Sequence, residues 1–469
     1  NNIYKKSMTS EVLGFIMFGV TMVALLLGFP VAFTLAGTAL LFAALGDYFD
    51  LINFGMLSLY PLRIFGIMKT ETLVAVPLFV FMGVMLEKSN IAANLLETMA
   101  RLFGRKAGGL GISVVIVGAL LAASTGIVGA TVVTMGLMSL PVMLKAGYSK
   151  RVSSGLICAS GTLGQIIPPS IVLVLLAEIL QGANEQASEL KGELVPDNPV
   201  TAIDLFAGAL LPGLLLVIFY LVFQVIIAIL NPGSSPALIR NIEENNQNKV
   251  NLLELFQIIA APLFLIVIVL GSILTGIATP TESAAVGAIG ASIIAAITGK
   301  LNLYILKTVS QETTKISSMV FIILIGASMF SLVFRGFGGD VIVEEFLMNL
   351  PGGPTAALLI VMAIIFFLGF FLDFIEIIFV VVPIVAPILI AVGFDPLWLG
   401  VMIGINLQTS FLTPPFGFAL FYLRGVAPKE VTTKEIYLGV LPFILIQIIA
   451  LSTIWFFPQI VLWLPSFIF

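Results

Sequence analysis

The chain has 469 residues, of which 59% are hydrophobic and only 10% are charged, whereas soluble domains carry roughly 25% charged residues. It contains no histidine, one cysteine and no P-loop pattern. These absences exclude histidine-dependent catalysis or metal binding, an internal disulfide, and ATP hydrolysis by a P-loop. Many uncharged apolar runs reach the roughly 20 residues that cross a bilayer as a helix. The composition therefore predicts an all-α polytopic membrane protein.

The chain begins with segments that predict scaffold helices. Ser10–Gly28 and Val31–Leu45 are two apolar runs of helical length, separated by a Gly-Phe-Pro break. The mixed segment Asp47–Thr70 has charged residues among aromatic ones, and we expect it to lie along a membrane interface. Thr72–Leu86 is the next predicted span. Charged residues are frequent from Glu87 to Lys106.

Residues 107–144 then carry no charge and are interrupted near the middle by Ser124-Thr125-Gly126. Each arm is about 16 residues, or about 24 Å of helix, which falls short of the roughly 30 Å hydrocarbon core. We interpret this stretch as a re-entrant hairpin. Residues 152–181 are long enough to cross, but Gly161-Thr162-Leu163-Gly164 and Pro168-Pro169 interrupt them, which predicts a broken transmembrane helix.

The polar, acidic segment Gly182–Asp204 separates this broken helix from a further span at Phe206–Leu230. A Pro/Ser/Asn-rich linker, residues 231–253, divides a first repeat (1–230) from a second (254–469). The second repeat follows the same plan. Its predicted elements are spans at Leu255–Leu274, Thr279–Ile297 and Ile316–Phe334, a hairpin at 353–392, a broken helix at 396–423 and a last span at Ile436–Phe457.

An internal alignment supports this duplication. Residues 123–170 match residues 369–416 at an offset of 246 without a gap, and four of the five identities are Pro or Gly, which restrict backbone geometry. In both copies a glycine, an aromatic residue and a Ser or Asp predict a helix stop followed by an N-cap. The identical pairs are Pro141/Pro387, Gly147/Gly393, Ile157/Ile403, Pro168/Pro414 and Pro169/Pro415.

Charge predicts that the two copies have opposite orientations. Lys and Arg flank the first hairpin, at 101–106 and 145–151, whereas the segments flanking the second hairpin contain neither. By the positive-inside rule the first hairpin enters from the cytoplasm and the second from outside. Two inverted repeats, each with a hairpin and a broken helix, are typical of secondary transporters.

A broken membrane helix frees backbone groups that lipid cannot satisfy. Carbonyls and hydroxyls suit sodium, and helix N-termini suit a carboxylate. Asp373 and Glu376 lie at the second hairpin tip, where intramembrane carboxylates are costly and usually functional. Glu282 has either a capping role at a helix start or a functional one. Arg335 is either an interfacial anchor or a contact for an anionic substrate.

Four motifs occur in order along the chain: Ala123-Ser124-Thr125-Gly126, the run from Gly161 to Ser170, Thr279-Pro280-Thr281-Glu282-Ser283-Ala284, and Thr413-Pro414-Pro415-Phe416-Gly417. With nearly the whole chain, they resemble the large membrane subunit of TRAP (tripartite ATP-independent periplasmic) transporters. The resemblance implies a sodium-driven, elevator-type carrier in the bacterial inner membrane. It also implies a small membrane subunit and a periplasmic binding protein that delivers a small organic acid; no nucleic-acid partner is expected.

The repeat and the resemblance together predict the site. We expect about two sodium ions and a carboxylate substrate such as a dicarboxylate or a sugar acid, held between the two hairpin tips. The alternative is that the hydroxyls only bond to backbone carbonyls and the Gly/Pro breaks only kink buried helices. The predicted sodium ligands are Ser124, Gly164, Ile167 and Ser170 for one site and Gly369, Ser410, Thr413 and Phe416 for the other, and the predicted substrate contacts are Thr125, Ser170 and Asp373.

Two other functions fit parts of the sequence. A stand-alone sodium/anion symporter shares the predicted architecture but needs no partner proteins. An intramembrane enzyme would use Asp373 and Glu376 as an acid–base pair, since residues three apart can share a helix face. The enzyme does not account for the duplicated broken helices, so we expect a transporter and not an enzyme.

Overall fold

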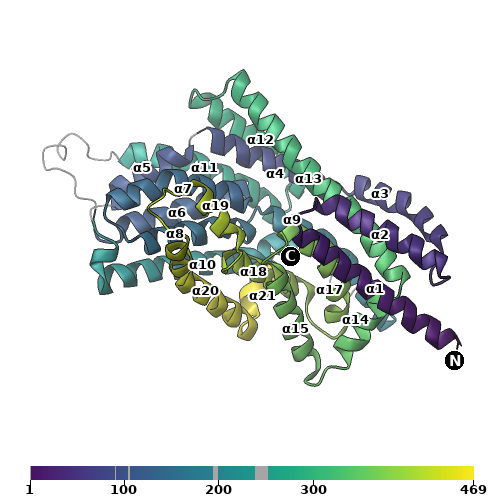
Figure 1. Cartoon of the computed structure of the whole chain (residues 1–469). Coiled ribbons are helices and arrows are strands. Elements are labelled where there is room, and N and C mark those ends of the chain that lie inside the picture. The colour runs from purple at the N-terminus through teal and green to yellow at the C-terminus, as the bar shows by residue number, and fades with distance from the viewer. Residues whose placement is uncertain (1, 90, 104–105, 194–198, 238–251, 469) are drawn as a thin grey trace, which may run out of the picture. The chain divides into compact units, whose positions relative to one another are not determined.

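A computed structural model of the chain describes residues 2–89, 91–103, 106–193, 199–237 and 252–468. Every regular element in these ranges is helical (Figure 1). By length and composition, eight of the described helices can cross a membrane, or nine if one bent pair is counted as a span. The all-α, polytopic architecture predicted from composition is therefore confirmed.

The helices gather into two compact units that cut across the two predicted repeats. Each unit takes residues from both halves of the chain. Unit 1 comprises Asn1–Leu73, Leu175–Thr201 and Lys315–Leu399, and unit 2 comprises Val74–Val174, Ala202–Thr314 and Gly400–Phe469. Four helices contribute residues to both units: α4 (Glu71–Lys88), α9 (Ile171–Lys191), α13 (Leu303–Gly336) and α18 (Pro396–Leu412).

Unit 1 contains the first helices of the chain and the second predicted hairpin. The first helices bond to the C-terminal half of α13 and to the residue after it: the Tyr60 hydroxyl donates to the Ile325 carbonyl over 3.0 Å, and the Ser10 hydroxyl donates to the Phe337 carbonyl over 3.2 Å. The remaining helices of this unit are α1 (Asn2–Leu26), α2 (Val31–Tyr48), η1 (Phe54–Leu59), α3 (Tyr60–Lys69), α14 (Gly339–Met348), α15 (Gly353–Leu368), α16 (Phe374–Glu376), the π-helix η5 (Ile377–Val381) and α17 (Val382–Ala391).

Unit 2 contains the first predicted hairpin and both helix breaks. Helix α8 is its centre, because it contacts α6, α7 and α20. The helices of unit 2 are α5 (Ile91–Phe103), α6 (Gly109–Thr125), α7 (Val128–Lys145), α8 (Lys150–Thr162), η2 (Leu163–Gln165), α10 (Ala202–Leu230), η3 (Pro232–Ser234), α11 (Leu252–Leu274), α12 (Pro280–Ile297), α19 (Phe418–Val426), α20 (Thr433–Phe456) and α21 (Gln459–Ile468).

The contact of α8 with α20 depends on two glycines that face each other's backbone. A Cβ atom on Gly155 would lie 2.1 Å from the Gly439 carbonyl oxygen, and one on Gly439 would lie 2.2 Å from the Arg151 carbonyl oxygen. No side chain larger than hydrogen fits at either position. In a membrane, where apolar surface gains little from burial, such close backbone packing is a main source of helix association.

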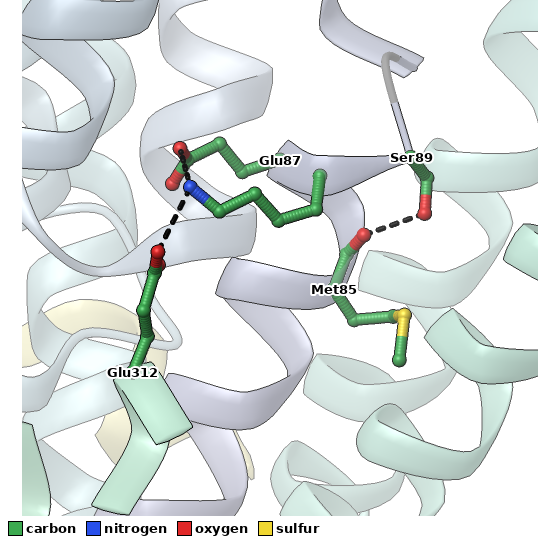
Figure 2. Close-up of polar contacts among 5 residues, drawn as sticks. Met85, Glu87, Ser89 and Glu312 are labelled. Atoms are coloured by element: carbon green, nitrogen blue, oxygen red, sulfur yellow. Dashed lines mark hydrogen bonds and ion pairs between the residues drawn. The ribbon is translucent and has the colours of Figure 1, made fainter. Parts of the chain in front are cut away.

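A lysine between two carboxylates connects the end of α4 to the first part of α13 within unit 2. The Lys88 ammonium lies 3.3 Å from the Glu87 carboxylate and 3.1 Å from the Glu312 carboxylate (Figure 2). The Lys88 and Glu312 side chains are 30% and 40% exposed. Ion pairs this accessible contribute about 0–1 kcal/mol, so this contact orients the two helices more than it stabilises them.

Two segments are more helical than the sequence analysis predicted. Helix α9 continues through Lys191, so the predicted polar segment Gly182–Asp204 is largely helical at its start. The repulsion between Glu185 and Glu189, four residues apart, costs only a few tenths of a kcal/mol, and a single interior glycine costs only about 1 kcal/mol, so neither feature ends the helix. The charged segment after Glu87 likewise contains α5, a 13-residue helix. Most of the predicted linker, residues 238–251, lies outside the described residues.

Candidate transport site

The first hairpin turns where the sequence predicted. Helix α6 ends at Thr125 and α7 begins at Val128. Gly126 makes the turn with a φ of 61°, a left-handed conformation that favours glycine. The hydroxyls of Ser124 and Thr125 each donate to the Leu121 carbonyl over 2.9 Å. The tip is therefore compact and bonded to its own helix.

The first broken helix is also confirmed in position. Helix α8 ends at Thr162, the short helix η2 follows, and helical structure resumes at Ile171 as α9. In the break, the Ser170 hydroxyl donates to the Gln165 carbonyl over 2.8 Å. The Pro168–Pro169 peptide bond is cis. The start of α9 thus faces the break with amides that have no partner in a preceding helical turn.

The tip of the first hairpin packs directly against this break. A Cβ atom on Gly126 would lie 3.3 Å from the Ile171 nitrogen and 3.4 Å from the Pro169 oxygen, and one on Gly164 would lie 3.4 Å from the Ala122 oxygen. The four residues predicted to bind the first sodium ion lie on the segments that meet at this contact, and all four are buried. They are Ser124, Gly164, Ile167 and Ser170.

The chemistry of this contact is that of uncharged oxygen atoms. Each hydroxyl uses its proton in a bond to a backbone carbonyl, which is the structural role considered above, and it keeps its lone pairs for a cation or a donor. In the described part of the chain, no group of three or more His, Cys, Asp or Glu residues could hold a metal ion. A cation at this place would therefore be held by hydroxyl and carbonyl oxygens, a donor set that suits sodium.

One polar residue at the break was not singled out from the sequence. The Gln165 side chain has no exposed surface, and neither its amide oxygen nor its amide nitrogen has a hydrogen-bond partner among the described residues. Unpaired buried amide groups are costly, which makes such a residue a candidate contact for a ligand. In the sequence, Gln165 is the one amide side chain between Gly161 and Ser170.

The second hairpin turns at Gly369–Asp373 in unit 1. Helix α15 ends at Leu368 and α16 begins at Phe374. The Phe374 amide donates to the Asp373 carboxylate over 2.7 Å, and the Asp373 amide donates to the Glu376 carboxylate over 3.3 Å. The two acidic residues form a capping box, which satisfies the amides at the start of the second arm. This pairing gives both acids a structural role at the tip.

In the second break, which lies in unit 2, side-chain hydroxyls donate to backbone carbonyls as in the first break. Helix α18 ends at Leu412 and α19 begins at Phe418. The Ser410 hydroxyl donates to the Leu407 carbonyl over 2.8 Å, and the Thr413 hydroxyl donates to the Thr409 carbonyl over 2.7 Å. The Pro414–Pro415 bond is cis. Three of the four residues predicted for the second sodium site, those from Ser410 to Phe416, lie here, whereas Gly369 belongs to unit 1.

Equivalent positions of the two repeats meet inside unit 2. Position 162 plus the offset of 246 is position 408, and the Gln408 amide donates to the Thr162 hydroxyl over 3.4 Å. The predicted helix stops are confirmed as well, since Gly147 and Gly393 have φ values of 84° and 108°. Asp395 caps α18 by accepting from the Trp398 amide over 2.9 Å, whereas Ser149 precedes α8 without a side-chain capping bond.

The structure shows what Glu282 and Arg335 contact. Glu282 forms a capping box with Thr279 at the start of α12, with the Thr279 amide donating to its carboxylate over 2.8 Å. The capping alternative therefore holds. Arg335, on α13 in unit 1, donates to the Gln186 side-chain oxygen over 2.9 Å and to the Pro383 carbonyl over 3.2 Å. It connects α9 to the second arm of the hairpin.

Comparison with known proteins identifies the family. The model of the "Tripartite ATP-independent periplasmic transporter, DctM component" matches residues 18–460. The chain belongs to this family. Its DctM relatives are multi-pass inner-membrane permeases, so this chain is a transport protein of the inner membrane and not an enzyme. Asp373 and Glu376 are therefore not a catalytic acid–base pair.

Several curated TRAP permeases are similar over almost the whole chain. The C4-dicarboxylate TRAP transporter large permease of Rhodobacter capsulatus is 30% identical over 96% of this chain and 98% of its own. The sialic acid permease of Vibrio cholerae is 28% identical over 94% of this chain and 95% of its own, and the ectoine permease of Halomonas elongata is 28% identical over 95% and 97%.

A solved structure supports the fold alone. The Alcanivorax borkumensis YdaH transporter, described as having an unusual topology, aligns with a TM-score of 0.54 at 14% identity. The alignment covers 83% of this chain and 86% of that protein. At this identity the match concerns the arrangement of helices and carries no information on the substrate.

Proposed function

We propose that this TRAP permease imports a small organic acid together with sodium, by an elevator mechanism. A periplasmic binding protein delivers the acid, and a small membrane subunit completes the transporter. The observation that carries the proposal is the packing of the first hairpin tip against the first helix break. This contact lines up buried hydroxyls, carbonyls and the unpaired Gln165 amide without any charged side chain.

The absence of basic residues favours sodium coupling. The sequence has no Lys or Arg in residues 107–144, 152–181 or 346–423, which include both hairpins and both breaks. A carboxylate that enters such surroundings needs a compensating charge, because burying an isolated charge is very costly. Sodium ions held by neutral oxygens supply that charge. In this proposal the first ion is held by Ser124, Gly164, Ile167 and Ser170.

The substrate is proposed to be an organic acid. Thr125 supplies a hydroxyl, and the start of α9 after Ser170 supplies free amides and the positive end of a helix dipole, which favour a carboxylate. Asp373, the third residue predicted to contact the substrate, belongs to unit 1 and stays a prediction. The relatives named above transport a C4-dicarboxylate, sialic acid and ectoine, so these three compounds form a suitable test panel.

The binding protein is proposed to dock on the periplasmic face, near the end of α9 and the second hairpin. The support is the charge pattern of the sequence, since basic residues flank the first hairpin and acidic residues occur in the C-terminal part of α9 and just after it. In this orientation the acidic residues Glu185, Glu189 and Glu193 belong to the docking side.

Dependence on partners distinguishes this proposal from a stand-alone symporter. We expect proteoliposomes with this chain, the small subunit and the binding protein to accumulate at least one compound of the panel. Omission of the binding protein should reduce uptake at least tenfold, because the carrier then loses its delivered substrate. Equal uptake by this chain alone would favour the stand-alone symporter.

A pair of variants tests the second sodium site. The Thr413 side chain offers an oxygen that Thr413→Ala removes, whereas Phe416 can offer only its carbonyl, and this residue is 43% exposed. We therefore expect Thr413→Ala to raise the sodium concentration for half-maximal uptake several-fold. Phe416→Leu should change this concentration by no more than about twofold, which corresponds to about 0.4 kcal/mol. Equal damage from the two variants would indicate a packing role.

A further inference from the structure

Unit 1 contains a cavity, lined by charged as well as apolar side chains, that the proposed transport mechanism does not use. Its volume is about 650 Å³, within the range of small-molecule sites. Segments of α3, α9, α13 and η5 line it, together with the start of α17. It shares no residue with the predicted sodium and substrate sites. Its polar lining includes Arg63, Thr70, Glu178, Glu185, Ser328 and Arg335.

Two guanidinium groups border this cavity without a carboxylate partner. Arg63 donates to the Ser328 carbonyl at 3.5 Å, the upper limit for a hydrogen bond. Arg335 donates to an amide oxygen and a carbonyl, and its Nε atom is buried with no partner in the part of the chain described. Within the described ranges neither arginine forms an ion pair, although Glu178 and Glu185 line the same cavity. Guanidinium groups are the side chains best suited to bind a carboxylate.

The two carboxylates in the cavity lining indicate which groups a ligand needs besides its own carboxylate. The Thr70 hydroxyl lies 3.5 Å from the Glu178 carboxylate, and Glu185 lies about two helical turns further along α9. Ionised carboxylates only accept hydrogen bonds, so they suit hydroxyl or ammonium groups. With two positive and two negative groups, the cavity is complementary to an organic acid that also carries hydrogen-bond donors.

The surroundings make Arg63 the principal anchor. Arg335 also borders a smaller cavity of about 280 Å³, to which Glu189, Asp340 and Glu344 contribute. These acidic side chains weaken the attraction of Arg335 for an anion. Arg63 does not line that second cavity, so these acidic side chains reduce its attraction for an anion less.

We propose that the cavity bordered by Arg63 and Arg335 is a second binding site for an organic acid with hydroxyl or amine groups, and that it binds without sodium. The arginines supply the charge that sodium supplies at the transport site. The proposal rests on the proposed function only for the choice of ligand. It implies that the permease can hold its substrate before sodium-coupled binding begins.

Equilibrium binding to the purified full-length chain tests the proposal. In sodium-free choline buffer, calorimetry is run in detergent with N-acetylneuraminate, ectoine and succinate as probes. We expect one saturable site for N-acetylneuraminate or ectoine, and weaker binding of succinate, which offers no donors at neutral pH. Arg63→Gln should weaken the binding at least tenfold, and Glu185→Gln should weaken it several-fold. Arg101→Gln is the matched control, because Arg101 pairs with Glu97 outside the cavity, and it should change nothing.

Arg63→Gln is the decisive variant, because Arg335 also bonds two neighbouring elements and its loss could unfold unit 1. Absence of sodium-free binding for all three probes, or binding unchanged by Arg63→Gln, would overturn the proposal. Binding in detergent that disappears in phosphatidylethanolamine nanodiscs would assign the cavity to a lipid headgroup and would overturn it as well. Sodium-driven uptake is a separate measurement, so a failure of the proposed function would not be mistaken for a failure of this site.

Discussion

Uptake by proteoliposomes that contain the complete transporter is expected to fall at least tenfold when sodium outside is replaced by potassium or choline. No basic side chain occurs in either hairpin or either broken helix, so the bound carboxylate has no fixed countercharge there. A tenfold effect corresponds to about 1.4 kcal/mol. The cost of burying an unpaired ion is several kcal/mol, so the expected loss is a lower limit.

The measurement separates sodium from other driving forces. Vesicles are loaded and diluted so that either a sodium gradient, a proton gradient or internal ATP is the only energy source. Uptake is expected with the sodium gradient alone, since the chain has no P-loop and no histidine for a proton relay. Full-rate uptake without sodium, or uptake driven by ATP, would refute the coupling.

The second large effect concerns folding. Gly155→Val should prevent accumulation of folded protein, because its Cβ atom would lie 2.1 Å from the Gly439 carbonyl oxygen. Overpacking usually costs about 1–3 kcal/mol, and a clash with backbone cannot be relieved by a rotamer change, so we expect a cost at or above that range. Fluorescence-detected size-exclusion chromatography and thermal unfolding in detergent measure the effect.

The matched control is Gly271→Ala in α11, where a Cβ atom would have no neighbour within 4 Å. This helix-interior change should be neutral or should stabilise the protein by up to about 1 kcal/mol. If Gly155→Val and Gly271→Ala gave the same yield and melting temperature, α8 and α20 would not cross as closely as described.

Local signals in the sequence were sufficient for the positions of the hairpins and the breaks. Gly126 readily adopts the left-handed conformation that ends a helix, and the Pro168-Pro169 pair and its counterpart Pro414-Pro415 each fix φ and remove amide donors, so these residues favour a helix break. The helix stops at Gly147 and Gly393 follow from the same rule. Asp373-Phe374-Ile375-Glu376 also has the spacing of a capping box, and its structural role was readable from that spacing.

Tertiary structure decided which of these local features come into contact. The sequence alone determined the all-α membrane class, the duplicated plan and the break residues, because each depends on composition or on neighbours a few positions apart. Three features depend on residues from separate helices. They are the approach of Gly155 to Gly439, the burial of Gln165 without a partner among the described residues, and the cavity that Arg63 and Arg335 share. Helix packing selects those pairs, and periodicity along the chain does not encode which helices become neighbours.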